Sequence, residues 1–185
     1  MKLKTRENEP KKVLIYGLDG SGKSTFAEKY CKDNNLNPIV IDVDNTNYTG
    51  CNIVDIDLST DIKAYQNMKD VIKEIVVSDY DTIIIDGVSS LIELFTSKAN
   101  AMKAYKDRAD RFNSVLRKLI NSKKNLIFVG QADMEVIYNE DHQSNKPVIK
   151  TNSIVNEKYR TYIDSKGHFS SKTEKFRGAG SNGES

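Results

Sequence analysis

The chain has 185 residues, of which 38% are hydrophobic and 29% charged, and its formal net charge is +2. This composition predicts a soluble globular protein, and the length favours one domain with one core. No apolar run approaches the roughly 20 residues that a membrane-spanning helix needs, and residues 1–10 lack a signal-peptide core. We therefore expect a cytoplasmic protein without a membrane partner. Cys31 and Cys51 are isolated, which argues against a zinc or redox role.

Charge is distributed unevenly along the sequence. Residues 98–124 contain nine Lys/Arg against two Asp, and residues 146–177 contain eight Lys/Arg against three acids. The remainder of the chain is therefore acidic. Two basic segments could bind a polyanion, although two solvated faces explain the same pattern equally well.

Hydrophobic patterns predict the elements in chain order. Residues 1–12 are expected to form a flexible arm, residues 13–17 a buried strand and residues 23–34 a helix. The pattern then predicts, in order, a strand at 39–44, a short strand at 52–56, a helix at 61–77, a strand at 82–86, a helix at 98–121 and a strand at 125–130. In the helix at 61–77 we expect a core stripe that includes Ile62, and in the helix at 98–121 a stripe that includes Tyr105 opposite a basic face that includes Arg108.

Strands that alternate with helices predict an α/β fold with a mostly parallel central sheet. The C-terminal part breaks this alternation, because residues 158–164 and 168–176 are typical of an antiparallel hairpin. Residues 178–185 are expected to form a disordered tail. The predicted core therefore covers residues 13–177.

Residues 17–24 read G-x-x-x-x-G-K-S, the phosphate-binding P-loop, between a predicted strand and a predicted helix. That context is what this motif requires. Glycines let backbone N–H groups turn towards phosphate oxygens, and the helix start adds free amides. Lys23 is expected to reach the β- and γ-phosphates, and Ser24 to ligate Mg²⁺. The predicted nucleotide-binding residues are Gly17, Asp19, Gly20, Ser21, Gly22, Lys23, Ser24 and Thr25.

Three further side chains lie where predicted strands end. Asp86 ends an apolar strand about sixty residues after the P-loop, where a Walker B acid that holds Mg²⁺ is expected. Asp44 ends the neighbouring strand and could polarise an attacking water; Asp42 lies on the same strand face, so either could serve. Gln131 follows the last strand, where its amide could touch both a γ-phosphate and the next loop.

Four stretches in this order resemble the RecA-type ATPase core, and most closely the small phage RecA-like proteins linked to single-strand annealing. They are Gly17–Ser24, Ile41–Asp44, Ile83–Leu91 and Ile127–Gln131. The resemblance covers roughly residues 10–180 and implies a P-loop NTPase fold with a RecA-like core. It implies Asp44 as the catalytic base, in place of the usual glutamate. It also implies that Gln131 couples the γ-phosphate to a mobile DNA-binding loop at about residues 132–157.

The same resemblance implies an oligomer with ATP at the subunit interfaces. Lys175 and Arg177 fall where the family carries basic residues that reach a neighbouring subunit's γ-phosphate. The implied activity is DNA-dependent ATP hydrolysis with annealing or strand exchange of single-stranded DNA, using ATP and Mg²⁺. A single-strand DNA-binding protein is an implied partner, and the cytoplasm would be that of the host cell if a phage encodes the chain.

Two alternatives remain open from the sequence. The first is a nucleoside or nucleotide kinase, because the P-loop suits it equally well. However, residues 45–58 contain no arginine for an acceptor phosphate. The second is a nucleotide-gated binding module without significant turnover, which the shorter acid at position 44 would suit.

Overall fold

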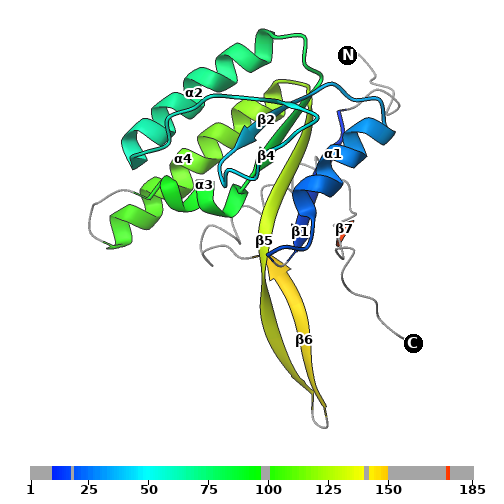
Figure 1. Ribbon diagram of the computed structural model, residues 1–185. Helices are drawn as coiled ribbons and strands as arrows, with labels where there is room; N and C mark the ends of the chain where they lie inside the picture. The colour runs from blue at the N-terminus through cyan, green and yellow to red at the C-terminus, as the bar shows by residue number, and fades with distance from the viewer. Residues whose placement is uncertain (1–9, 18, 97–100, 140–141, 150–173, 176–185) are drawn as a thin grey trace, which may run out of the picture.

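The structure is a computed structural model that describes residues 10–17, 19–96, 101–139, 142–149 and 174–175 (Figure 1). Its helices and strands follow one another in this order: β1 (Lys12–Gly17), α1 (Lys23–Asp33), β2 (Pro38–Asp42), β3 (Asn52–Ile53), α2 (Asp61–Val77), β4 (Thr82–Asp86), α3 (Val88–Leu94), α4 (Ala101–Asn121), β5 (Asn125–Asn139), β6 (His142–Ile149) and β7 (Glu174–Lys175).

The central sheet has the strand order β3-β2-β4-β5-β1-β7, and all its neighbouring pairs are parallel. The predicted α/β fold with a mostly parallel sheet is therefore confirmed. Strand β5 lies between β1, which leads into the P-loop, and β4, which ends in Asp86. Because β4 and residues 126–130 of β5 are buried on both faces, their sequences are mainly continuous apolar runs rather than alternating ones.

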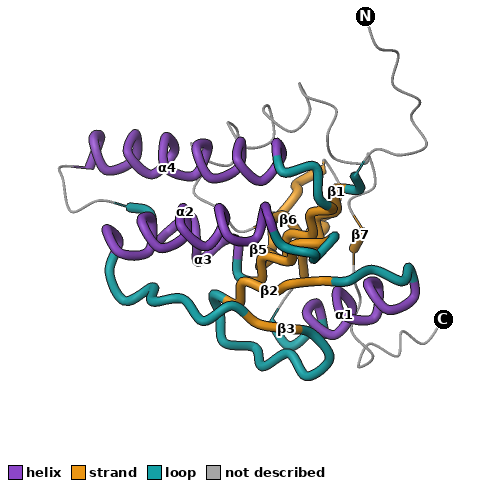
Figure 2. The backbone as a smooth tube through the Cα atoms, turned by 90° about the horizontal axis from the view of Figure 1, so that it is seen from above, coloured by secondary structure: helices purple, strands orange, loops and turns teal. Residues whose placement is uncertain are grey.

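Helices cover both faces of the sheet and make a three-layer structure (Figure 2). Helices α2, α3 and α4 pack on one face, where Met68, Leu91, Phe112 and Phe128 belong to one buried cluster. Helix α1 packs on the other face, where its Ala27 and Cys31 join a second cluster. Burial raises the pKa of the Cys31 thiol to about 12, and both cysteines are free.

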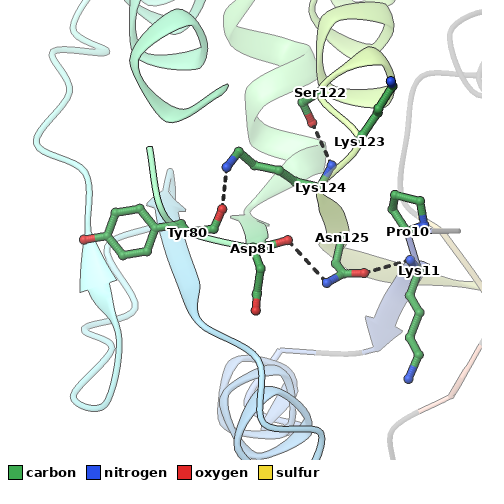
Figure 3. A pocket seen from close by; sticks show the side chains of 8 residues that line it. All are labelled: Pro10, Lys11, Tyr80, Asp81, Ser122, Lys123, Lys124 and Asn125. Carbon is green, nitrogen blue, oxygen red and sulfur yellow. Dashed lines mark hydrogen bonds between the residues drawn. The ribbon is translucent and has the colours of Figure 1, made fainter. Parts of the chain in front are cut away.

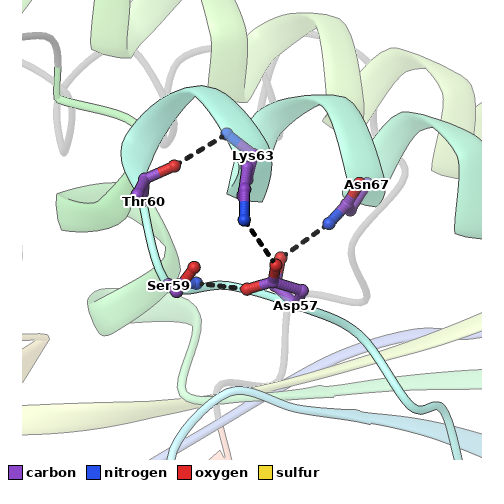
Figure 4. Close-up of polar contacts among 5 residues, drawn as sticks. All are labelled: Asp57, Ser59, Thr60, Lys63 and Asn67. Atoms are coloured by element: carbon purple, nitrogen blue, oxygen red, sulfur yellow. Dashed lines mark hydrogen bonds and ion pairs between the residues drawn. The ribbon is translucent and has the colours of Figure 1, made fainter.

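The start of α2 shows how local sequence sets an element boundary (Figure 4). Thr60 is the N-cap, and its hydroxyl accepts a hydrogen bond from the Lys63 N–H at 3.3 Å, a typical helix-initiating bond. Asp57 accepts from the Ser59 N–H at 2.9 Å and pairs with the Lys63 ammonium at 3.1 Å. These hydrogen bonds, from Ser59 first, lower the pKa of Asp57 to about 2.

Two of the predicted helix faces need correction. Ile62 was expected in the core stripe of α2 but is 70% exposed, because the buried positions are Ala64, Met68, Ile72 and Ile75. Arg108 was expected on the basic face of α4 but is only 5% exposed. Its guanidinium lies 4.8 Å from the Tyr105 ring centroid and donates to the Thr96 hydroxyl at 3.2 Å. The stripe residue Tyr105 is itself 36% exposed.

The loop expected at about residues 132–157 is, over much of its length, a β-ribbon. Strand β5 runs without interruption to Asn139 and pairs antiparallel with β6, from Ala132 opposite Ile149 to Asn139 opposite His142. Figure 1 shows the ribbon extending away from the body of the protein. The segment 132–149 was expected to be a loop because the family resemblance implied one there, although Ala132, Met134 and Val136 alternate with Asp133 and Glu135 as in a strand.

The predicted C-terminal hairpin lies mostly outside the described residues. Its described part, β7, pairs parallel with the edge of β1, with Glu174 opposite Ile15 and Lys175 opposite Tyr16. At the other end, β1 begins at Lys12, one residue earlier than predicted, and the Lys11 N–H donates to the Asn125 side chain at 2.8 Å. None of the helices in the described ranges is long and apolar enough to cross a membrane.

Candidate functional site

The carboxyl ends of β1, β2 and β4, together with the middle of β5, bring the candidate residues to one edge of the sheet, the edge at which these strands end. Asp42 at the end of β2 lies opposite Asp86 at the end of β4, and Gly17 at the end of β1 lies opposite Gln131 in β5. In a parallel sheet this edge is where ligands bind, because loops and helix N-termini gather there. The structure therefore brings together residues that are up to about 110 positions apart in sequence.

The P-loop has the backbone that phosphate binding requires. Gly20 and Gly22 have φ values of +71° and +79°, which residues with a Cβ rarely adopt. Gly22 is the N-cap of α1 and makes no side-chain cap bond, so the first N–H groups of the helix, which have no carbonyl partner within it, lie next to the loop. The Ser21 hydroxyl is buried without a hydrogen-bond partner in the described chain. These features fit an anionic group of the size of a phosphate.

The remaining P-loop side chains lie around this start of α1. Lys23 is its first residue and is half-buried. Asp19 and Thr25 are exposed. Lys23 therefore lies in the first turn of α1, and its role in phosphate binding stays a prediction.

Asp86 is the most constrained group of the site. It is 3% exposed, and its Oδ2 accepts hydrogen bonds from three hydroxyl groups. These come from Ser24, from Thr46 at 3.1 Å and from Tyr48 at 2.7 Å. Ser24 and Asp86 are therefore in direct contact, so the two side chains could ligate one magnesium ion.

Burial and hydrogen bonding act in opposite directions on this carboxylate. Burial raises the pKa of Asp86, and the hydrogen bonds from Ser24, Tyr48 and Thr46 lower it. Burial likewise raises the pKa of Tyr48, and the neighbouring charge of Asp86 adds to this rise. Tyr48 therefore stays a neutral hydroxyl that donates to the carboxylate.

The two candidate bases occupy different positions. Strand β2 ends at Asp42 rather than at Asp44 as predicted. Asp42 binds the following loop, since its carboxylate accepts from the Thr46 N–H at 3.0 Å and the Asn47 N–H at 3.2 Å. Asp44 is exposed and lies over Gly87, where a Cβ would be 2.6 Å from the Asp44 Cγ. Asp44 is thus the better placed of the two to meet a ligand.

Gln131 lies at the point where β5 leaves the main sheet. It is opposite Gly17, whereas Asp86 is opposite Val129 on the same strand. The Gln131 N–H donates to the buried Ser89 hydroxyl at 3.3 Å. Gln131 therefore lies between the P-loop and the helix that follows Asp86, and it is continuous with the ribbon.

The remaining predicted residues are placed only in part. The backbone of Lys175 pairs with Tyr16, next to the P-loop, so β7 ends near the site. Arg177 lies outside the described residues. A role for either residue in a neighbouring subunit stays a prediction.

A pocket of about 500 Å³ lies at the opposite edge of the sheet (Figure 3). Two of its polar side chains, Lys124 and Asn125, are bound to the protein itself. The Lys124 ammonium donates to the carbonyls of Ser78, at 2.8 Å, and Tyr80. Asn125 accepts from the Lys11 N–H and donates to the Asp81 carbonyl at 3.3 Å. These bonds join the beginnings of β1, β4 and β5, so the pocket is a structural feature rather than the nucleotide site.

Sequence reasoning missed three residues of the site. Thr46 and Tyr48 lie between the strands predicted at 39–44 and 52–56 and, like Gly87, received no role. Gly87 could have been found, since glycine is the residue that a left-handed turn after a strand favours, and its φ is +84°. The two hydroxyls had no such local signal.

The comparison with known families agrees with this geometry. A family model described as an AAA domain matches residues 9–175, almost the whole chain. No curated protein matches this chain. The match covers the P-loop, Asp86, Gln131 and β7 together, and it supports a P-loop nucleotide-binding domain. The chain therefore belongs to the AAA domain family.

Proposed function

We propose that this protein is a RecA-like ATPase that binds single-stranded DNA and promotes annealing or strand exchange. One observation supports this most directly. Strand β5 lies between the P-loop strand and the strand of Asp86, and the same strand continues past Gln131 into the projecting ribbon. A single continuous strand thus links the nucleotide site to a surface that a polymer could reach.

ATP would lie along the P-loop with its phosphates at the start of α1. The loop amides and Lys23 would bind the β- and γ-phosphates. Ser24 and Asp86 would hold Mg²⁺, which neutralises phosphate charge when bound. The unpartnered Ser21 hydroxyl supports this arrangement, since a phosphate oxygen would give it an acceptor.

Asp44 would act as the general base. Its carboxylate lies over Gly87, directly after Asp86, and is exposed to solvent from which a water could enter. It would accept a proton from that water as the water attacks the γ-phosphate. Aspartate is one methylene shorter than glutamate, and the missing Cβ at Gly87 allows its carboxylate to come close to β4.

The basic face of α4 would contact the DNA backbone. Lys103, Lys106 and Arg117 are exposed there, whereas the ribbon segment 132–149 carries four acids and one lysine. The phosphate contacts expected from residues 132–157 are therefore better assigned to α4, and the ribbon would contact bases. Backbone phosphate contacts predict strong salt dependence of binding.

Oligomer formation would complete the site. Strand β7 ends beside Tyr16 at the edge of the sheet, and Lys175 and Arg177 would supply a stabilising cation to the neighbouring subunit's ATP. A single-strand DNA-binding protein is the proposed partner.

The test is ATP hydrolysis by the purified protein with and without single-stranded DNA, beside a Lys23→Ala control. We expect hydrolysis that DNA stimulates and that the Lys23→Ala variant lacks, together with annealing of labelled complementary strands. Phosphate that appears on an added nucleoside or nucleotide would instead establish a kinase. Binding of ATP and DNA without turnover would establish a nucleotide-gated module.

A further inference from the structure

Three hydroxyl groups donate hydrogen bonds to one oxygen of Asp86, and only one of these hydroxyls belongs to the P-loop. In the described chain, the hydrogen bonds that reach this carboxylate all end on Oδ2. Ser24 is the P-loop donor. Thr46 and Tyr48 come from the loop after β2, which crosses from the neighbouring strand to Asp86.

The loop that carries Thr46 and Tyr48 is fixed at both ends. At its start, Asp42 accepts from the N–H groups of Thr46 and Asn47, and from the Thr46 hydroxyl at 3.2 Å. At its end, Tyr48 is 8% exposed and packs in the core cluster of α1 with Val40 and Ile84. The two hydroxyls are therefore held at Asp86 by the fold rather than by chance side-chain positions.

Such an arrangement has a cost that a purely structural role does not explain. A buried carboxylate loses hydration, and hydrogen bonds from neutral hydroxyls recover only part of it. An apolar side chain at the end of β4 would avoid this cost. What the donors achieve is orientation, because with Oδ2 fixed by three donors the rotation of the carboxylate is set.

We propose that Thr46 and Tyr48 are positioning residues for the metal-binding carboxylate. By binding Oδ2 they leave Oδ1, which has no donor among the described residues, to face the magnesium ion or a water bound to it. This inference rests on the proposed function, since it requires that a metal–nucleotide complex binds at this edge. Hydrogen-bond partners that orient a metal ligand typically change metal affinity or activity by about 10–100-fold when removed.

The test compares Tyr48→Phe with Tyr80→Phe, each of which removes one hydroxyl. The Tyr80 hydroxyl accepts from the Asn52 side chain at 3.0 Å and makes no bond to Asp86. ATP affinity is measured by calorimetry across a Mg²⁺ titration, and again in EDTA without Mg²⁺. For Tyr48→Phe we expect a rise of about tenfold in the Mg²⁺ concentration that gives half of the increase in ATP affinity. Its ATP affinity in EDTA should be unchanged. Tyr80→Phe should match the wild type in both.

Substitutions of Thr46 provide a second, independent test of the same proposal. Thr46→Val removes the hydroxyl at nearly constant shape, and Thr46→Ser restores a hydroxyl at the same position. We expect a raised Mg²⁺ requirement for Thr46→Val and a wild-type requirement for Thr46→Ser. A general structural role would instead lower the affinity in EDTA and in Mg²⁺ by the same factor.

The outcomes separate this inference from the proposed function. If the wild type binds ATP in a Mg²⁺-dependent way and Tyr48→Phe and Thr46→Val have the same Mg²⁺ requirement, the positioning role is wrong and the proposed function stands. If the wild type binds no ATP, both are wrong.

Discussion

The edge of the central sheet where the strands begin and the edge where they end use polar side chains in different ways. At the edge where β1, β4 and β5 begin, Lys124 and Asn125 bind backbone carbonyls and N–H groups of neighbouring segments. At the edge where the strands end, Asp42 also binds backbone N–H groups, but the side chains around Asp86 bind one another. Three hydroxyls converge on the buried carboxylate of Asp86, and the Ser21 hydroxyl has no hydrogen-bond partner among the residues that the structure describes.

This difference distinguishes structural from functional polar groups. Backbone groups must be satisfied wherever they are buried, so side chains that bind them stabilise the fold. A buried charge with neutral partners is costly and adds little stability. Such a group indicates a ligand that completes the site. Substitutions at the two edges should therefore have opposite effects on stability and on activity.

Asp86→Asn should give the largest effect on activity. Hydrolysis should fall by at least about 100-fold, because an amide is a poor ligand for Mg²⁺. The melting temperature should stay the same or rise, since a neutral amide avoids the cost of burying a charge and still accepts from the hydroxyls. Parallel turnover assays and calorimetric melts measure both. A large fall in melting temperature would contradict a functional role for this group.

Lys124→Met should lower the stability and leave the activity unchanged, the reverse of Asp86→Asn. Two backbone carbonyls would lose a charged donor, which costs about 1–3 kcal/mol of unfolding free energy. Activity of the folded protein should remain. Lys123→Met is the matched control. The Lys123 side chain is next to Lys124 in sequence but is exposed, and surface substitutions usually change stability by less than about 0.5 kcal/mol. Urea unfolding gives the values, and equal losses in the two variants would refute the structural role of Lys124.

Gly87→Ala should lower both the stability and the activity moderately. The φ of +84° should cost about 1–2 kcal/mol with a Cβ present, and the Cβ would displace the Asp44 carboxylate. A double-mutant cycle with Asp44→Ala separates these contributions. The backbone cost should persist in the double variant, whereas the contact with Asp44 should vanish. Additive effects would show that Asp44 does not lie over Gly87 in solution.

Asp57→Asn should give the smallest effect, confined to a pH window. The pKa of Asp57 is lowered to about 2 in the folded protein from an ordinary value of 3.8. Its ionised form therefore stabilises the fold above pH 3.8, and this contribution disappears as the pH falls towards 2. The stability difference between wild type and variant should shrink over that interval in urea titrations. A difference that does not change with pH would rule out the carboxylate as its source.

Local patterns in the sequence predicted those parts of the molecule that depend on neighbours along the chain. The P-loop, the strand that ends in Asp86 and the bounds of α2 follow from apolar periodicity and glycine positions. Thr46 and Tyr48 could not be predicted, because their bonds to Asp86 form only when β2 and β4 pair. The ribbon was missed because the family resemblance implied a loop there, although Asp133 and Glu135 alternate with apolar residues as in a strand. Arg108 was placed outside because its burial depends on the packing of α4.

The most direct test of the central claim is where ATP binds. Calorimetric titration of Mg²⁺–ATP into wild type, Lys23→Ala and Lys123→Met compares the two edges in one experiment. Binding should be lost or weakened at least about 100-fold in Lys23→Ala, since a charged phosphate contact is removed, and should be unchanged in Lys123→Met. Equal affinity of Lys23→Ala and wild type, or loss of binding in Lys123→Met alone, would contradict the assignment of the nucleotide site to the P-loop edge.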